Sequence, residues 1–267
     1  MKPTVISNEY LALQTSIANK QLDWTNILVK TTVVEKQPIQ HKQVPIIAQV
    51  NVNVDLKHYQ EWMIELSDLL VENDENLRND INKIKELLNE DIVERWASEV
   101  LAFNQFYFQS FAEEEKLPEW LPYFIAEHGL RPFLRVVSKA YSEDFPNQDT
   151  KGICPCCGEP IRLAVLEEKG KKMIICPRCE AKWGQMRLHC SNCGNDNHEK
   201  LTYFNVENDK SSKLEVCGQC NGYIKIIDTR KLFKKQSAFL LDVISIHLDF
   251  IAQENDFGTK KEDEIKS

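Results

Sequence analysis

The sequence predicts a mainly α-helical N-terminal bundle, followed by a pair of small β modules of the zinc-ribbon class and closed by a C-terminal helix. Apolar residues in the first 150 positions recur at three- and four-residue steps, the period of an amphipathic helix. All nine cysteines lie between residues 154 and 220, and eight of them form Cys-x-x-Cys pairs. Short β-type runs lie between these pairs, so each module is expected to hold a strand hairpin between two cysteine turns.

The helices of the N-terminal half follow from this period and its interruptions. The clearest stripe places Leu56, Tyr59, Met63, Leu66 and Leu70 on one face of a helix. The expected helices are 11–30, 55–73, 74–91, 91–115 and 117–145.

Three of these helices have predicted starts, ends or breaks. Pro38 and Pro45 interrupt the pattern after the first helix. Asp74 is the expected N-cap of 74–91. The stretch 117–145 is expected to form two helices that meet at Gly129 and Pro132, because both residues weaken a helix interior.

The C-terminal half begins after a polar linker, 142–152. Each module then reads as knuckle, strand, turn, strand, knuckle, and a helix over 234–255 is apolar on more than one stripe. The expected boundaries are 1–146 for the α-helical domain, 147–186 and 187–231 for the two modules, 232–257 for the C-terminal helix and 258–267 for a charged, disordered tail.

Length and composition indicate a globular protein with room for more than one domain. The chain has 267 residues, 42% of them hydrophobic, and a formal charge of −8. Apolar runs such as 238–246 are shorter than the roughly 20 residues that a membrane span requires, so no membrane insertion is expected. The first residues show no charged start, apolar core and cleavage site of a secretory signal, and the sequence therefore predicts a cytoplasmic protein.

The eight paired cysteines predict two metal sites. A Cys-x-x-Cys turn presents two thiolates on one tight loop, and two such turns complete a tetrahedral site. Glycines support this interpretation, because Gly158 and Gly194 directly follow their pairs and Gly218 lies inside the fourth. The predicted ligands are Cys154, Cys157, Cys176, Cys179, Cys190, Cys193, Cys217 and Cys220.

Three features of these sites stay open in the sequence. Sequential use of the pairs (first with second, third with fourth) follows the hairpins and is favoured over an interleaved arrangement. Four thiolates suit either zinc or a single iron. Cys156 is the spare cysteine, for which a small residue filling the knuckle turn is favoured over a reactive thiol. His189 and His198 flank the third pair and are alternative ligands.

Charge and coordination weigh against several classes of function. Residues 151–231 carry +4, but two four-thiolate centres would each contribute about −2 once a divalent ion is bound, which leaves little attraction for nucleic acid. An enzyme needs an open coordination position, and four protein ligands leave none. A helical bundle with two docking modules favours a protein-binding factor. The alternatives are a zinc-ribbon adaptor for another client, a rubredoxin-like redox protein and a nucleic-acid-binding zinc ribbon.

The motifs resemble those of a known family. The segments CPCCGEP (154–160), ICPRCEAKWGQMRLHCSNCG (175–194) and LEVCGQCNGYIKIID (214–228) are similar to the FdhE family, accessory proteins of formate dehydrogenase formation. Trp183 after the second pair and Arg187 ahead of the third belong to the same pattern. The stretch 248–258 resembles the family's closing helix, and 130–137 resembles part of its helical domain more faintly.

The resemblance implies a fold, a partner and a metal. It implies an α-helical domain followed by two rubredoxin-like modules, in a cytoplasmic, non-catalytic factor needed to make active formate dehydrogenase. The implied partner is the catalytic subunit, which carries a molybdenum or tungsten pterin cofactor; a second copy of the chain is a further candidate. The eight paired cysteines take the metal-binding role, with iron as the ion usually proposed. Cys156 departs from the family pattern and receives no role from it.

Overall fold

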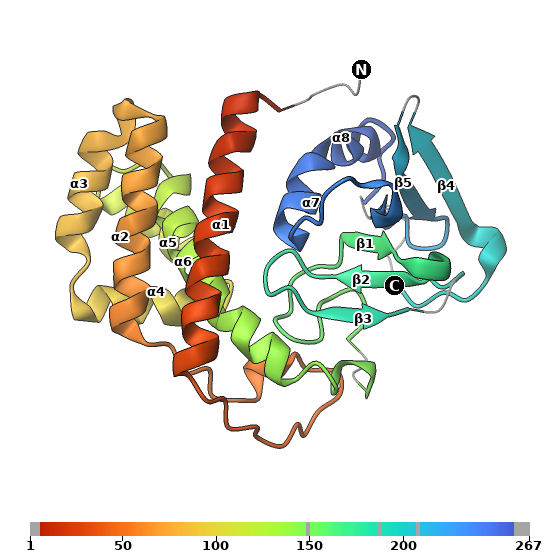
Figure 1. The fold of residues 1–267 in the computed structure, drawn as a ribbon, viewed down its shortest axis with the longest axis horizontal. Helices are drawn as coiled ribbons and strands as arrows, with labels where there is room; N and C mark the ends of the chain where they lie inside the picture. The colour runs from red at the N-terminus through yellow and green to blue at the C-terminus, as the bar shows by residue number, and fades with distance from the viewer. Residues whose placement is uncertain (1–5, 148–149, 186–187, 207–208, 259–267) are drawn as a thin grey trace, which may run out of the picture. The chain divides into compact units, whose positions relative to one another are not determined.

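The fold contains two compact units. The computed structural model describes residues 6–147, 150–185, 188–206 and 209–258. One unit, here called the helical unit, comprises Asn8–Glu35 and Asn51–Val137. The other, the sheet unit, takes the described residues 6–7, Lys36–Val50 and the described chain after Val137. Figure 1 shows helices alone in the first and a sheet covered by two helices in the second.

The helical unit is built from amphipathic helices whose starts are capped by side chains. Asp55 Oδ1 accepts from the backbone N–H of His58 at 3.0 Å, and Asn89 Oδ1 accepts from that of Ile92 at 2.9 Å. Such caps satisfy N–H groups that the helix itself leaves without partners. The helices are α1 (Asn8–Thr31), α2 (Leu56–Asn73), α3 (Arg78–Leu87), α4 (Glu90–Leu101), α5 (Gln105–Glu114) and α6 (Trp120–Ala140), whose last residues are counted with the sheet unit.

Two of the expected helices are divided differently. The helix expected over 91–115 is wrong, because the chain turns at Phe103 with φ 55° and Asn104 caps the new helix α5. The break expected at Gly129 and Pro132 is also wrong, because α6 runs through both residues. A Cβ at Gly129 would lie 3.0 Å from Met63 Cγ, so this glycine allows α6 to approach α2 closely.

Two local expectations for this half are confirmed, the cap at Asp74 and most of the apolar stripe on α2. Asp74 does cap, although the segment it starts is a 3₁₀ turn, Glu75–Leu77, that leads into α3. Of the predicted stripe on α2, Tyr59, Met63, Leu66 and Leu70 are buried, while Leu56 is partly exposed.

Aromatic side chains form much of the core of the helical unit. The rings of Trp24 and Trp62 stack with centroids 5.3 Å apart, and Phe133 lies 5.1 Å from Trp62. Trp96 is fully buried and meets Phe108 and Phe111 edge to face. Rings of this size bury large apolar areas, so their burial stabilises the helical unit.

A single six-stranded sheet carries both cysteine modules. Its strand order is β3-β2-β1-β6-β5-β4, and every pairing is antiparallel except the central one, in which β1 and β6 run parallel. The expected pair of modules is therefore present, but joined into one sheet through Ala164 and its partner Ile226. The strands are β1 (Leu163–Leu166), β2 (Lys172–Ile175), β3 (Lys182–Gly184), β4 (Leu201–Val206), β5 (Asp209–Cys217) and β6 (Tyr223–Asp228).

Two short helices close the sheet unit where one was expected. The segment 234–255 forms α7 (Ala238–Ile244) and α8 (Ile246–Glu254), separated at Ser245. They share an apolar cluster with the sheet, to which Leu241, Leu248 and Ala252 contribute from the helices. Figure 1 shows both helices against the sheet.

A buried ion cluster fixes these two helices to the centre of the sheet. Lys225 on β6 is 1% exposed, and its ammonium lies 2.8 Å from an Asp242 carboxylate oxygen and 2.6 Å from one of Asp249. One aspartate comes from each helix, so a single cation holds both.

The remaining expectations concern the ends of the chain and the membrane. The expected tail 258–267 lies outside the described residues beyond Gly258. Among the helices that the structure describes, none is both long and apolar enough to cross a membrane.

Candidate metal centres

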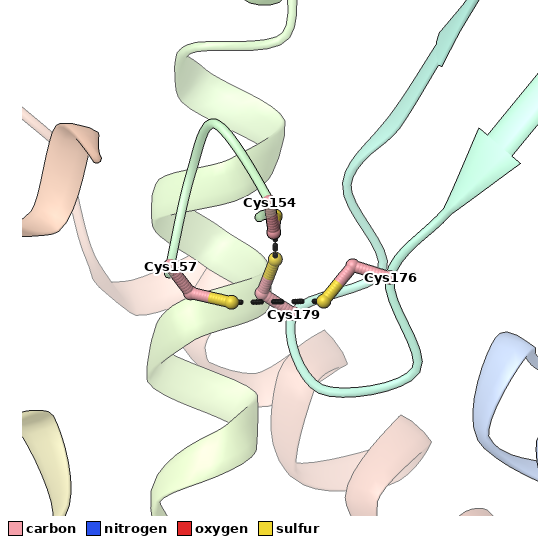
Figure 2. A group of neighbouring side chains, drawn as sticks. All are labelled: Cys154, Cys157, Cys176 and Cys179. Carbon is pink, nitrogen blue, oxygen red and sulfur yellow. Dashed lines mark hydrogen bonds between the residues drawn. The ribbon is translucent and has the colours of Figure 1, made fainter. Parts of the chain in front are cut away.

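The first candidate centre gathers the first two cysteine pairs. We call Cys154, Cys157, Cys176 and Cys179 centre 1; their sulfur atoms all lie within 4.8 Å of one another. Two contacts join the two loops, at 3.6 Å for Cys154–Cys179 and 3.6 Å for Cys157–Cys176. Figure 2 shows the four side chains converging from two loops on one point.

The second candidate centre gathers the other two pairs. We call Cys190, Cys193, Cys217 and Cys220 centre 2, and their sulfurs satisfy the same limit. Cys190 and Cys220 are 3.7 Å apart, and Cys193 and Cys217 are 3.9 Å apart. The structure thus groups the pairs sequentially, and the interleaved alternative is not the one found.

In each Cys-x-x-Cys loop, the backbone N–H and the backbone C=O of the first cysteine both form hydrogen bonds that close the loop. In the first loop Gly158 N–H donates to Cys154 C=O at 3.0 Å, and Cys154 N–H donates to Glu159 C=O at 2.8 Å. The turn needs a left-handed residue just after the pair, and Gly158 and Gly194 supply it with φ of 78° and 75°.

The other two loops make the same turn without glycine. Glu180 follows the second pair with φ 59°, and Asn221 follows the fourth with φ 57°. The role suggested for Gly218 therefore belongs to Asn221, a residue type that tolerates this conformation comparatively well.

The sulfur arrangement fits a tetrahedral metal ion. A zinc–thiolate bond of about 2.3 Å places the sulfurs of a regular tetrahedron about 3.8 Å apart. The four sulfur–sulfur separations given above, 3.6 to 3.9 Å, lie around that value. Both clusters are suited to metal ions on this ground, and four thiolates suit zinc and iron equally.

The electrostatics of the thiols point the same way. Burial raises the pKa of Cys154, Cys157 and Cys179. At Cys176 burial also acts to raise the pKa, but hydrogen bonds from the surrounding thiols outweigh it and lower it. A bound cation would let the remaining thiols ionise, since metal binding releases their protons.

The residues singled out beside the ligands have structural roles or lie outside the clusters. Cys156 is fully buried, as expected of a residue that fills the knuckle turn. His189 and His198 belong to neither four-cysteine group. Tyr223 donates from its hydroxyl to Asp249 at 2.9 Å. Arg187 lies outside the described residues.

One contact was not foreseen from the sequence. The backbone N–H groups of Ile46 and Ile47 donate to the carbonyls of Pro155 and Cys156 at 2.9 and 3.0 Å. These bonds attach a segment more than 100 residues earlier in the chain to the first knuckle of centre 1. Pro45 ahead of this segment was interpreted only as a helix breaker, and it does not indicate a partner in the first knuckle.

These features define a class: a two-unit protein in which one sheet carries two four-cysteine centres suited to metal ions. Comparison with known proteins extends this description. The family model described as "FdhE, C-terminal domain" matches residues 188–264. The C-terminal part of the chain is therefore similar to the FdhE family.

Curated relatives support this assignment over part of their length. The chain is 34% identical over 111 residues to the FdhE homolog of Aquifex aeolicus, covering 40% of this chain and 39% of that protein. It is 31% identical over 114 residues to FdhE of Salmonella arizonae, covering 41% of this chain and 36% of that protein. The matches thus span well under half of these relatives.

The fold similarity extends over nearly the whole chain. The crystal structure of the FdhE protein from Pseudomonas aeruginosa matches with a TM-score of 0.59 and 16% identity. It covers 93% of this chain and 90% of that one. At this identity the comparison bears on the fold.

Proposed function

We propose that this protein is a cytoplasmic, non-catalytic accessory factor needed to form active formate dehydrogenase, and that it acts by binding the catalytic subunit. The similarity of its C-terminal part to the FdhE family carries this proposal. The two four-cysteine clusters support it, because four protein ligands complete a tetrahedral ion and leave no position for a substrate.

The eight paired cysteines would hold two ions, either zinc or iron. Zinc would make both centres structural, whereas iron could change oxidation state. In either case the ions would fix the knuckle loops that project from the sheet. The helical unit would then supply a second surface for the client.

Complementation tests this function directly. A host that makes formate dehydrogenase and lacks its own FdhE would receive this chain together with a tagged catalytic subunit. Formate dehydrogenase activity should return, and the chain should copurify with the subunit. Full activity without the chain, or no copurification, would contradict the proposal; capture of a different protein would favour an adaptor for another client.

Two neighbouring cysteines provide a matched pair of variants for the metal sites. Cys157→Ser removes a ligand of centre 1, whereas Cys156→Ser changes a buried cysteine outside the group. We expect Cys157→Ser to lose about one metal ion per chain and most of the restored activity. Cys156→Ser should retain both. If the two variants had the same metal content and restored the same activity, the proposed role of the paired cysteines as metal ligands would be wrong.

A further inference from the structure

The two centres differ in their access to solvent. In centre 1 the four cysteines are all buried, none more than 3% exposed. In centre 2 Cys190 and Cys217 are buried, but Cys193 and Cys220 are partly exposed. The two sites share ligand type and spacing, so they differ in the exposure of their cysteines to solvent.

Centre 1 is closed from within the sheet unit. The segment Ile46–Ala48 is a 3₁₀ turn, and two of its backbone N–H groups are bonded to the knuckle between Cys154 and Cys157. Ile46 is fully buried there. Removing an ion from centre 1 therefore requires this turn to detach or the knuckle to open.

Fewer groups of the sheet unit enclose the sulfurs of centre 2. The apolar cluster that contains its cysteines adds the side chain of Leu201. Asn195 Nδ2 approaches Cys217 Sγ at 4.0 Å, and the Gly222 N–H donates to Cys220 Sγ at 3.4 Å. These contacts hold the sulfurs in place without enclosing Cys193 and Cys220.

An open cavity also reaches centre 2. It has a volume of about 360 Å³, and Cys190 is one of its lining residues. Lys151, Gln185, His189 and Ser191 contribute polar groups to the lining, and Ile161, Ile174 and Trp183 contribute apolar ones. A small soluble ligand could enter this cavity, and the cationic Lys151 favours an anionic one.

We propose that centre 2 is a metal-exchange site, through which an ion enters and leaves by transfer to and from a small anionic chelating ligand, while centre 1 retains its ion. The proposal rests on the metal binding proposed above. In release, the divalent ion passes to the chelator, and the four thiolates left behind recover protons from water.

Zinc release tests this exchange on the full chain. The protein would be loaded with two zinc ions and mixed with excess of the coloured chelator 4-(2-pyridylazo)resorcinol. We expect two phases of equal amplitude, one ion per chain in each, with the fast phase at least about tenfold faster because only the slow one requires local opening. A single phase with both ions released together would overturn the inference. A chain that binds no zinc or iron would instead overturn the metal binding itself.

Pulsed alkylation assigns the phases without any substitution. After brief exposure to N-ethylmaleimide and chelator, mass spectrometry would locate the modified cysteines. We expect Cys193 and Cys220 to react during the fast phase, and Cys154 and Cys176 only during the slow one. Early modification of centre 1 would contradict the assignment.

A substitution in the cover provides an independent test. Ile46→Ala should accelerate the slow phase and leave the fast phase unchanged. The matched control is Ile81→Ala, which truncates an equally buried isoleucine in the helical unit. An unchanged slow phase in Ile46→Ala, or equal acceleration by Ile81→Ala, would show that the turn does not close centre 1.

Discussion

The helical unit and the sheet unit are each stabilised internally by a different kind of interaction. The helical unit buries large rings, among them Trp24, Trp62 and Trp96. The sheet unit has an aliphatic cluster on one face, but its knuckle loops surround thiols. Burial of apolar area stabilises the first unit, whereas the loops of the second lack comparable apolar contacts and are expected to depend on bound ions.

Metal removal should affect the two units most unequally. Structural zinc sites contribute about 10 kcal/mol in small peptides, so stripping both ions should open the knuckle loops. We expect amides of residues 152–180 and 190–222 to exchange rapidly after chelation, while amides of α2 and α6 stay protected. Hydrogen exchange with mass spectrometry measures this. Equal loss of protection in both units would contradict the comparison.

Truncating a core ring should act mainly on the helical unit. Trp96→Ala removes a fully buried ring in contact with Phe108 and Phe111, and a loss of about 3–5 kcal/mol in unfolding free energy is expected. Trp120→Ala is the control, because that ring is 49% exposed and its loss should cost under about 1 kcal/mol. Urea unfolding followed by circular dichroism would compare them. A similar cost for both would mean that ring burial does not stabilise this unit.

Breaking the buried ion cluster should act on the sheet unit. Lys225→Met removes the buried ammonium from the partly buried carboxylates of Asp242 and Asp249. Asp242 keeps Arg162 at 2.8 Å, but Asp249 loses the cation at 2.6 Å, which should destabilise the unit by about 3 kcal/mol. Lys182→Met breaks a more exposed pair with Glu167 and should cost under about 1 kcal/mol. Chemical denaturation of the metal-loaded chain measures both. A neutral Lys225→Met would show that packing alone holds α7 and α8.

Mild acid should weaken the helical unit through His128. Burial, together with Arg131 and Arg135, holds the pKa of His128 well below its usual 6.5. The unfolded chain therefore binds a proton that the folded chain does not, and the contribution of His128, complete above pH 6.5, declines as the pH falls below it.

Thermal melts at pH 7.5 and 5.5 would measure this decline. His128→Gln should reduce it, whereas His198→Gln, at an exposed position, should not. An identical pH dependence in the wild type and His128→Gln would rule out this histidine as the cause.

The candidate sites were predictable because short stretches of sequence determine their geometry. The spacing within each Cys-x-x-Cys pair fixes one loop, and the hairpin between two pairs brings two loops together. All eight predicted cysteines therefore lie in the two clusters, although metal binding by them stays a prediction. The amphipathic stripe on α2 was predictable for the same reason.

Features that depend on distant partners were not predictable. The parallel pairing of β1 with β6 joins strands about 60 residues apart, and nothing in either strand alone specifies its neighbour. From the sequence alone, Gly129 predicts a break in the helix, and its role becomes clear only once Met63 is seen to pack against it. Likewise, the attachment of Ile46 to the first knuckle is made by backbone groups, which carry no signature in the side chains.

The metal content of the chain, purified without oxygen, tests the account most directly. Two ions per chain are expected, one for each cluster, falling to one in the double variant Cys193→Ser/Cys220→Ser. Visible thiolate-to-iron absorption would identify iron, and its absence with two zinc ions would identify zinc. A folded, active protein with no bound metal would contradict the account, because its two four-cysteine clusters would then have no part in the fold or the function.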